Sequence, residues 1–205
     1  MQCQTGVDLR IATVNTKGGS GKTTSAVFLA VGLHQQGRTL LVDADPQSSS
    51  LLWSQQGEGF PFSTVSLPVN DLHKRLDELG KGYDHIVIDT PPGNLGIIRS
   101  AVLAVETVIV PVSPTGLDFN RMRPTFELLA ELEAANPVDA GVLLTKVRRG
   151  TRSAGGARQV LDELGYPVLD TEIPLAELYA GSFGSVPVFL GAYEQLLDEL
   201  SAVTQ

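Results

Sequence analysis

The residues with the clearest chemical potential lie in one short stretch near the N-terminus, 15–24, which reads NTKGGSGKTT. Its segment GKT matches the end of the phosphate-binding pattern G-x-x-x-x-G-K-[ST]. Thr16 stands where that pattern has its first glycine, and a second lysine, Lys17, lies inside the loop. The stretch therefore predicts a phosphate site with one more cation than the general pattern requires.

Each residue type in this loop has a task in holding a nucleoside triphosphate. Glycines let the backbone curl and direct its N–H groups at phosphate oxygens, and a helix that starts near Lys22 adds its positive N-terminal dipole. We expect the Lys22 ammonium on the β and γ phosphates and the Thr23 hydroxyl on Mg²⁺. The alternative is a glycine-rich turn without a ligand, but the position between a predicted strand and helix favours the site. The expected nucleotide-binding residues here are Lys17, Gly18, Gly19, Ser20, Gly21, Lys22, Thr23 and Thr24.

Three aspartates follow apolar runs and are candidates for the metal and for the attacking water. Asp89 ends the run HIVID and is the natural acidic partner of Mg²⁺, acting through water, although a lone aspartate there could simply cap a turn. Alternation places Asp43 and Asp45 on one face of their strand, where a cation or a proton would have to separate the two carboxylates. We expect Asp45 to contact the metal through water and to orient the attacking water; otherwise, with Pro46, it only begins a turn.

The elements that must position these residues alternate along the chain. Apolar runs rich in β-branched residues predict buried parallel strands, and the segments between them have helical patterns. This order predicts an α/β fold, a doubly wound and mostly parallel sheet with helices on both faces, in which ligands bind at the carboxyl ends of the strands. The predicted strands are 9–15, 39–45, 85–90, 107–112 and 140–147, and the predicted helices are 22–36, 70–80, 95–104, 118–135, 153–164 and 191–203.

Composition limits the class of protein. A chain of 205 residues with 42% hydrophobic and 19% charged residues is typical of a folded protein, and we expect a single domain over 1–205. No apolar run is long enough to span a bilayer and the N-terminus lacks a signal peptide pattern, so we expect a cytoplasmic protein. One cysteine, Cys3, can form no internal disulfide and cannot alone hold a metal cluster. The net charge of −8 disfavours general affinity for nucleic acid, so any such binding needs a local patch.

Four motifs taken together resemble one known family. The segments KGGSGKTT, LVDADPQ, YDHIVIDTPPG and IVPVSPTGLDF are similar, in order and spacing, to those of the ParA/MinD superfamily of deviant Walker A ATPases. The resemblance covers nearly the whole chain, and the small size is closest to the short ParF-like plasmid partition ATPases. It implies a P-loop ATPase that uses ATP and Mg²⁺, with the segment PVSPTGLDF near a dimer and assembly surface.

The resemblance also gives the second lysine a role. In this family Lys17 is implied to cross the interface of an ATP-bound homodimer and to contact the nucleotide of the other subunit. Electrostatics agrees, because a second ammonium beside Lys22 is repelled unless further negative charge is present. The same contact could stabilise charge on the transferred phosphoryl group, so Lys17, Lys22 and Asp45 are the predicted catalytic residues. Without the family, a solvated lysine at the edge of the loop would be the simpler interpretation.

The adenine site is implied by the resemblance alone. Family members hold adenine between the stretch after the fifth strand and a C-terminal loop, here LLTKV and TEIPLAELYAGSFGSVPV. The candidates are Thr145, Lys146 and Pro174. The residues at 175–183 depart from the pattern of chromosomal relatives.

A basic cluster at 146–158 is the candidate contact with nonspecific DNA, which family members bind as ATP dimers. Its arginines are Arg148, Arg149, Arg152 and Arg158. Dimerisation would double the patch and help to offset the acidic chain, although charged runs are more often solvated faces. The last helix has no lysine or arginine, which disfavours a membrane-binding role of the MinD kind.

The leading hypothesis for function is a slow ATPase for DNA partition. ATP would drive dimerisation and association with the nucleoid, and a centromere-binding ParB-like partner would stimulate hydrolysis and release. The cargo could instead be a protein assembly such as a carboxysome. A metabolic ligase of the dethiobiotin-synthetase type and a mainly structural nucleotide-dependent polymer are the other hypotheses.

Overall fold

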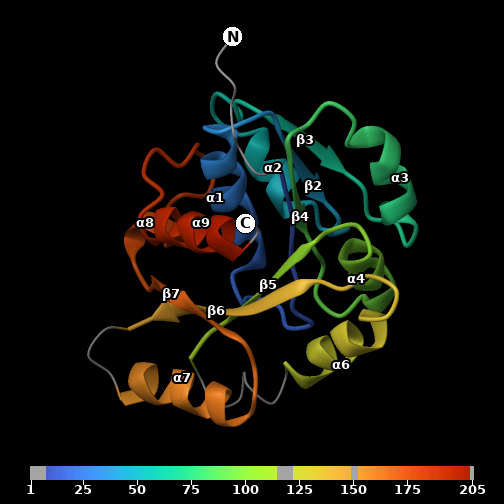
Figure 1. The fold of residues 1–205 in the computed structure, drawn as a ribbon. Coiled ribbons are helices and arrows are strands. Elements are labelled where there is room, and N and C mark those ends of the chain that lie inside the picture. The colour runs from blue at the N-terminus through green and yellow to red at the C-terminus, as the bar shows by residue number, and fades with distance from the viewer. Residues whose placement is uncertain (1–7, 115–121, 149–151, 204–205) are drawn as a thin grey trace.

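A seven-stranded parallel sheet forms the centre of the molecule (Figure 1). The computed structural model describes residues 8–114, 122–148 and 152–203. The strands lie in the order β3-β2-β4-β1-β5-β6-β7, and each neighbouring pair is parallel. They are β1 (Leu9–Thr13), β2 (Thr39–Asp43), β3 (Ser63–Ser66), β4 (His85–Asp89), β5 (Thr107–Val112), β6 (Asp139–Val147) and β7 (Val168–Pro174).

Helices cover both faces of the sheet, as the predicted doubly wound fold requires. One apolar cluster joins the sheet to α1, α2 and α9, and a second joins it to α3, α4, α6 and α7. Adjacent residues of a strand go to different clusters: Leu41 packs towards α1, and Val42 packs on the opposite face. The helices are α1 (Lys22–His34), α2 (Ser49–Ser54), α3 (Leu72–Leu79), α4 (Leu95–Val102), α6 (Arg123–Leu132), α7 (Arg152–Glu163), α8 (Glu177–Ala180) and α9 (Ala192–Val203).

The five predicted strands are present, but the prediction missed the two edge strands, β3 and β7. β3 is four residues long and half exposed, and β7 carries Asp170 and Glu172, so neither forms a continuous apolar run. The short helices α2 and α8 were missed too. All six predicted helices have a counterpart, although the first part of the 118–135 helix lies outside the described residues.

The strand register explains why distant motifs meet. Asp89 on β4 is level with Thr13 on β1 and with Asp43 on β2. The loops after these three strands therefore leave the sheet at the same edge. The predicted phosphate and metal residues all lie in or next to those loops.

Candidate nucleotide site

The loop between β1 and α1 has the backbone of an anion cradle. Gly19 and Gly21 have φ angles of 73° and 101°, a left-handed conformation in which a side chain would be strained. A Cβ atom at Gly18 or Gly19 would have no neighbour within 4 Å, so the loop presents open main chain on its outer side. Gly21 caps the N-terminus of α1 without any side-chain bond to the helix N–H groups. Those N–H groups are left for an anion.

Strands β5 and β6 and their flanks hold this loop in place. The Asn15 amide donates to the Pro111 carbonyl at 2.8 Å, while its oxygen accepts the N–H of Lys17 at 2.9 Å. From the other side, the Thr145 hydroxyl donates to the Ser20 carbonyl at 2.8 Å and the Lys146 ammonium donates to the Gly19 carbonyl at 2.7 Å. The loop is thus bonded before any nucleotide enters, which lowers the cost of ordering it on binding.

Lys22 lies inside the loop rather than on its surface. Only 6% of the residue is exposed, and its ammonium donates to the Lys17 carbonyl at 2.9 Å. Burial lowers the pKa of Lys22, and the charges of Asp89 and Asp45 oppose that shift. Phosphate oxygens would supply the negative charge and the acceptors that this buried ammonium lacks. Lys17 is only half-buried, and its backbone forms part of the loop floor.

The buried carboxylate of Asp89 is the strongest indication that this site binds a cation. The residue is 1% exposed, and neither carboxylate oxygen has a hydrogen-bond partner in the part of the chain that the structure describes. Burial raises its pKa to about 7, against the lowering effect of the nearby Thr23 hydroxyl, which does not reach full hydrogen-bond geometry. A buried carboxylate without donors is costly, and a hydrated cation would satisfy it.

The Asp89 and Thr23 pair fits Mg²⁺. Within the described ranges, no group of three His, Cys, Asp or Glu side chains forms a metal cage. Mg²⁺ usually needs no such cage, because it binds through one or two carboxylates, a hydroxyl, waters and the phosphates of the substrate. Bound there, it would neutralise charge that develops between the β and γ phosphates.

Asp43 and Asp45 do not share a site, which corrects the expectation of two facing carboxylates. β2 ends at Asp43, so strand alternation does not extend to Asp45. The buried Asp43 carboxylate accepts the N–H groups of Asp45 at 3.0 Å and Leu51 at 2.8 Å, which ties the start of α2 to the sheet. Desolvation nevertheless raises the pKa of Asp43. The charge of Asp45 adds to this shift, and the two backbone bonds give Asp43 a structural role.

Asp45 begins a turn, and it also lies at the wall of a cavity. Its carboxylate accepts the Gln47 N–H at 2.9 Å, and its carbonyl accepts the Ser48 N–H at 2.8 Å, so it does begin a turn. It also lines a polar cavity of about 300 Å³ beside the phosphate loop. This phosphate cavity is lined by Gly18, Gly19, Gly21, Lys22, Thr23, Thr24, Asp45, Ser49, Pro92 and Lys146.

A second, mostly apolar cavity of about 80 Å³ adjoins the first, and the two share Gly21, Thr24 and Lys146. It brings together the three predicted adenine residues, Thr145 and Lys146 of β6 and Pro174 at the end of β7. Lys146 has a φ of 56°, at a register irregularity between β6 and β7. This base pocket is lined by Gly21, Thr24, Thr145, Lys146, Ile173, Pro174, Leu175, Ala176, Tyr179, Ala180 and Tyr193.

Two tyrosines of the base pocket were missed by sequence reasoning. Tyr193, on α9, is 1% exposed and shares a 2.9 Å hydrogen bond with the Ser25 hydroxyl of α1. Its ring stacks on Phe28 at 4.9 Å between centroids, and Tyr179 meets both rings edge-on. Burial raises the pKa of Tyr193, so the hydroxyl stays neutral. The only sequence signal was an aromatic residue in an otherwise acidic helix.

The four arginines proposed to bind DNA differ in what the structure shows of them. The Arg158 guanidinium donates to the carbonyls of Leu169 at 2.6 Å and Asp170 at 3.2 Å, and it lies 3.6 Å from the Glu172 carboxylate. These bonds fasten α7 to β7 and neutralise the charge, which favours a structural role over contact with phosphates. Arg148 is exposed, Arg149 lies outside the described residues, and Arg152 begins α7 with a side chain that is not described.

A family model described as the CobQ/CobB/MinD/ParA nucleotide binding domain matches residues 11–187. The chain belongs to this family. Among its relatives, the maintenance of carboxysome distribution protein A of Gloeobacter kilaueensis is 36% identical over 168 residues, which cover 80% of this chain and 75% of that protein. The chromosome-partitioning ATPase Soj of Thermus thermophilus is 32% identical over 245 aligned positions, which cover 96% of each chain.

Solved structures of family members share the fold. An ATP complex of a McdA variant from Cyanothece superposes with a TM-score of 0.78 at 18% identity, over 95% of this chain and 97% of that one. Cobyrinic acid a,c-diamide synthase from Mycobacterium smegmatis, with a bound ATP analogue and magnesium, gives 0.75 at 22% identity, over 94% and 93%. The family resemblance and the fold predicted from sequence are thereby confirmed.

Proposed function

We propose that this protein is a ParA-type ATPase, a single domain over 1–205 that hydrolyses ATP slowly and uses the cycle to position a cargo in the cytoplasm. The observation that carries the proposal is the buried Asp89 carboxylate, which has no hydrogen-bond partner within the described residues and lies near Lys22 and Thr23, two residues that line the phosphate cavity. A structural loop would not need such an arrangement. A site for a magnesium nucleotide does, because its substrate supplies the missing charge and ligands.

The residues divide the work of the reaction. Lys22 leaves the Lys17 carbonyl and donates to phosphate oxygens, while the loop N–H groups and the start of α1 hold the remaining phosphate charge. Thr23 and Asp89 would hold Mg²⁺, which would supply positive charge beside the phosphates. Asp45, at the wall of the phosphate cavity, orients the attacking water. Thr145, Lys146 and Pro174 surround the base.

Lys17 acts in trans on the nucleotide of a second subunit, so ATP binding and dimerisation are coupled. Its neighbour Lys22 already occupies the inside of the loop, where a second ammonium would meet strong repulsion without more phosphate. In the dimer, each triphosphate offsets one lysine of its own chain and one of the partner. Loss of the γ phosphate removes part of that charge and favours dissociation.

The cargo we propose is DNA, as in plasmid or chromosome partition. The ATP dimer would bind nonspecific DNA of the nucleoid, and a centromere-binding ParB-like protein would stimulate hydrolysis. Arg148, Arg149 and Arg152 are the candidates for phosphate contact, and the exposed position of Arg148 supports this assignment for one of them.

A protein cargo is the second candidate, and one observation favours it. Relatives named for maintenance of carboxysome distribution match at 36% and 29% identity, alongside the Soj partition ATPase at 32%. The nucleotide chemistry would be the same for either cargo. The gene next to this one would distinguish them, because it should encode either a DNA-binding adaptor or an adaptor for a protein shell.

Sedimentation velocity tests the proposed cycle. We expect a monomer with ADP, a dimer with a nonhydrolysable ATP analogue and Mg²⁺, and co-sedimentation with DNA only in the second state. The Lys17→Ala variant should stay monomeric in both. A protein whose sedimentation ignores both nucleotide and DNA would contradict the proposal.

A further inference from the structure

Exposed apolar side chains gather on two segments of the chain that contact each other. Six of the ten large hydrophobic residues that are exposed in the described ranges belong to two segments, one on α2 and one around α8. We call this set the α8 surface. Its members are Leu52, Leu175, Leu178, Phe183, Val188 and Phe189.

Contacts between the two segments make this a continuous surface. The Phe183 ring lies 5.4 Å from the Trp53 ring, next to Leu52, and the Trp53 indole donates to the Ser185 carbonyl at 2.8 Å. At the other end, Leu178 lies against Gly191, close to the 71% exposed Phe189. A contiguous patch of this kind on a folded protein marks an interaction site.

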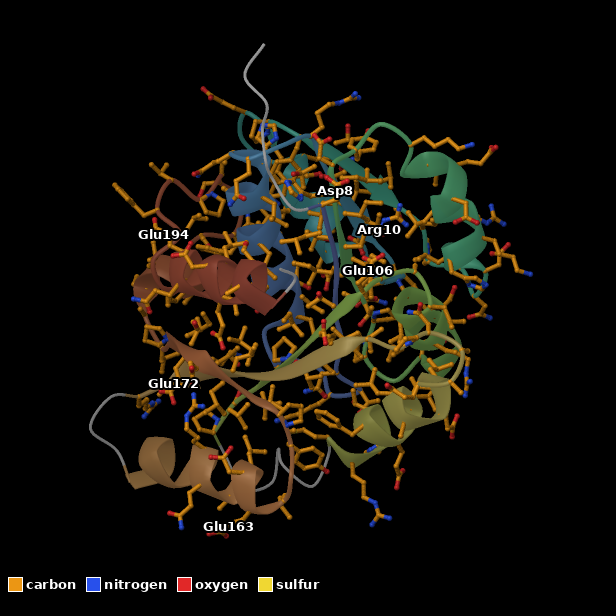
Figure 2. The ribbon with its side chains drawn as sticks, in the orientation of Figure 1. Asp8, Arg10, Glu106, Glu163, Glu172 and Glu194 are labelled. Carbon is orange, nitrogen blue, oxygen red and sulfur yellow. The ribbon has the colours of Figure 1, made fainter. Side chains whose placement is uncertain are left out.

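The segments that supply the α8 surface carry charge of a single sign. No lysine or arginine occurs at 39–73 or at 159–205, the two stretches of sequence that supply the patch. Exposed carboxylates lie beside it instead: Glu58 near the Phe183 turn, Glu177 on α8 and Glu194 at the start of α9, where Figure 2 labels it. The surface is therefore apolar at its centre and acidic at its rim.

We infer that the α8 surface docks a segment of a partner protein that carries apolar anchors flanked by lysine or arginine. DNA and anionic lipid would be repelled by the three glutamates, and a second copy of this chain would place glutamate against glutamate. A basic segment satisfies both features, because its apolar side chains cover the leucine and phenylalanine side chains while its cations meet the rim.

The position of this surface links docking to the nucleotide. Leu175 belongs to the α8 surface and also lines the base pocket, and Tyr179 of α8 lines the same pocket. A partner on α8 would therefore contact an element that also holds the base. The inference concerns this surface and its partner, and it stands whether the cargo is DNA or a protein assembly.

Fluorescence anisotropy with a synthetic probe tests the inference. The probe is a labelled 16-residue amphipathic peptide of leucine and lysine, and the control peptide has glutamate in place of every lysine. We expect saturable binding of the lysine peptide to the full chain, at least tenfold weaker binding to the Val188→Ser/Phe189→Ser and Glu177→Lys/Glu194→Lys variants, and no binding of the glutamate peptide. All four positions are exposed, so these variants should fold.

Matched variants lie at the other end of the molecule. Leu164→Ser and Glu163→Lys change an exposed leucine and an exposed glutamate near the end of α7, where Figure 2 shows Glu163 far from Glu194. They should bind the lysine peptide like the unaltered chain. Equal binding by all variants, or no binding by any, would overturn the inference.

Two other occupants give different results. Concentration-dependent dimerisation without nucleotide that Phe189→Ser abolishes would assign the surface to a second copy. Flotation with phosphatidylserine vesicles that Phe189→Ser abolishes would assign it to a membrane. Either result would overturn the inference while leaving the proposed ATPase cycle untouched. Loss of ATP-dependent dimerisation in Lys17→Ala remains the separate test of that cycle.

Discussion

The two adjoining cavities of the nucleotide site are built in different ways. The phosphate cavity is lined by glycines and by polar and charged residues, among them the buried Lys22, and the buried Asp89 carboxylate near Lys22 has no hydrogen-bond partner within the described residues. The base pocket is mostly apolar, and its polar groups are paired, as the bond between Ser25 and Tyr193 illustrates. Replacing a charged side chain of the first site should therefore change nucleotide binding or hydrolysis strongly. Replacing a polar side chain of the base pocket should change nucleotide binding only slightly.

Asp89→Asn should produce the largest change. The folded-state pKa of about 7 lies above that of an ordinary carboxyl, so the stability that Asp89 contributes is complete below pH 4 and is lost as the pH rises through 7. The full difference is up to about 4 kcal/mol. Without nucleotide and Mg²⁺, the variant should melt at a higher temperature than the unaltered chain at pH 8, and the two should converge near pH 4.

Thermal unfolding from pH 4 to pH 8 provides this comparison, with Asp162→Asn, at an exposed position of α7, as the control. The same Asp89 variant should lose magnesium-dependent ATP hydrolysis. A gap in Tm that does not change with pH would contradict the assignment of a buried, unpaired charge.

Lys22→Ala should have the next largest effect, on nucleotide affinity. Charge-assisted hydrogen bonds to phosphate are lost, and ATP binding should weaken by about 100-fold. Titration with a fluorescent ATP analogue measures this directly. An affinity within a factor of about three of the unaltered chain would mean that Lys22 only supports the loop through its bond to the Lys17 carbonyl.

Lys17→Ala should separate binding from assembly. The subunit keeps its own phosphate contacts, so affinity for ATP should change by less than about threefold, whereas ATP-dependent dimerisation should weaken by at least about tenfold. Analytical ultracentrifugation and the same fluorescent titration measure the two quantities on one sample. Parallel loss of both would place Lys17 in its own site.

Thr145→Val should have the smallest effect on ATP affinity. Thr145 lines the base pocket and also bonds to the phosphate loop. The substitution keeps the volume but removes the hydroxyl bond to the Ser20 carbonyl, which costs about 1 kcal/mol, or a few-fold in ATP affinity. Because the bond orients the loop rather than the metal, the magnesium dependence should not change. An effect as large as that of Lys22→Ala would contradict the contrast between the two cavities.

The same contrast explains what the sequence could predict. The proposed phosphate and metal residues Lys22, Thr23, Asp45 and Asp89 occur in short segments directly after buried strands, so residue type and spacing were enough to propose them. The base pocket is assembled from residues at 21–24, 145–146, 173–180 and 193, and no local pattern contains it. Thr145, Lys146 and Pro174 came from a family resemblance, and Tyr179 and Tyr193 were not among the predicted residues.

The wrong predictions have a common cause: they depend on contacts between distant parts of the chain, and local sequence patterns do not show such contacts. Asp43 was expected to face Asp45, but the strand ends there and backbone N–H groups of the next turn and of α2 capture its carboxylate. Arg158 belonged to a basic run, yet its bonds go to the carbonyls and carboxylates of β7. β3 and β7 lie at the sheet edges, where strands need no continuous apolar run.

The division of labour between the two lysines is tested most directly by a crystal structure with a nonhydrolysable ATP analogue and Mg²⁺. We predict a dimer in which the Lys22 ammonium contacts the phosphates of its own subunit and the Lys17 ammonium lies within about 3 Å of a phosphate oxygen bound to the other subunit. A complex in which Lys17 contacts only its own nucleotide, or points to solvent in an ATP-bound dimer, would contradict it.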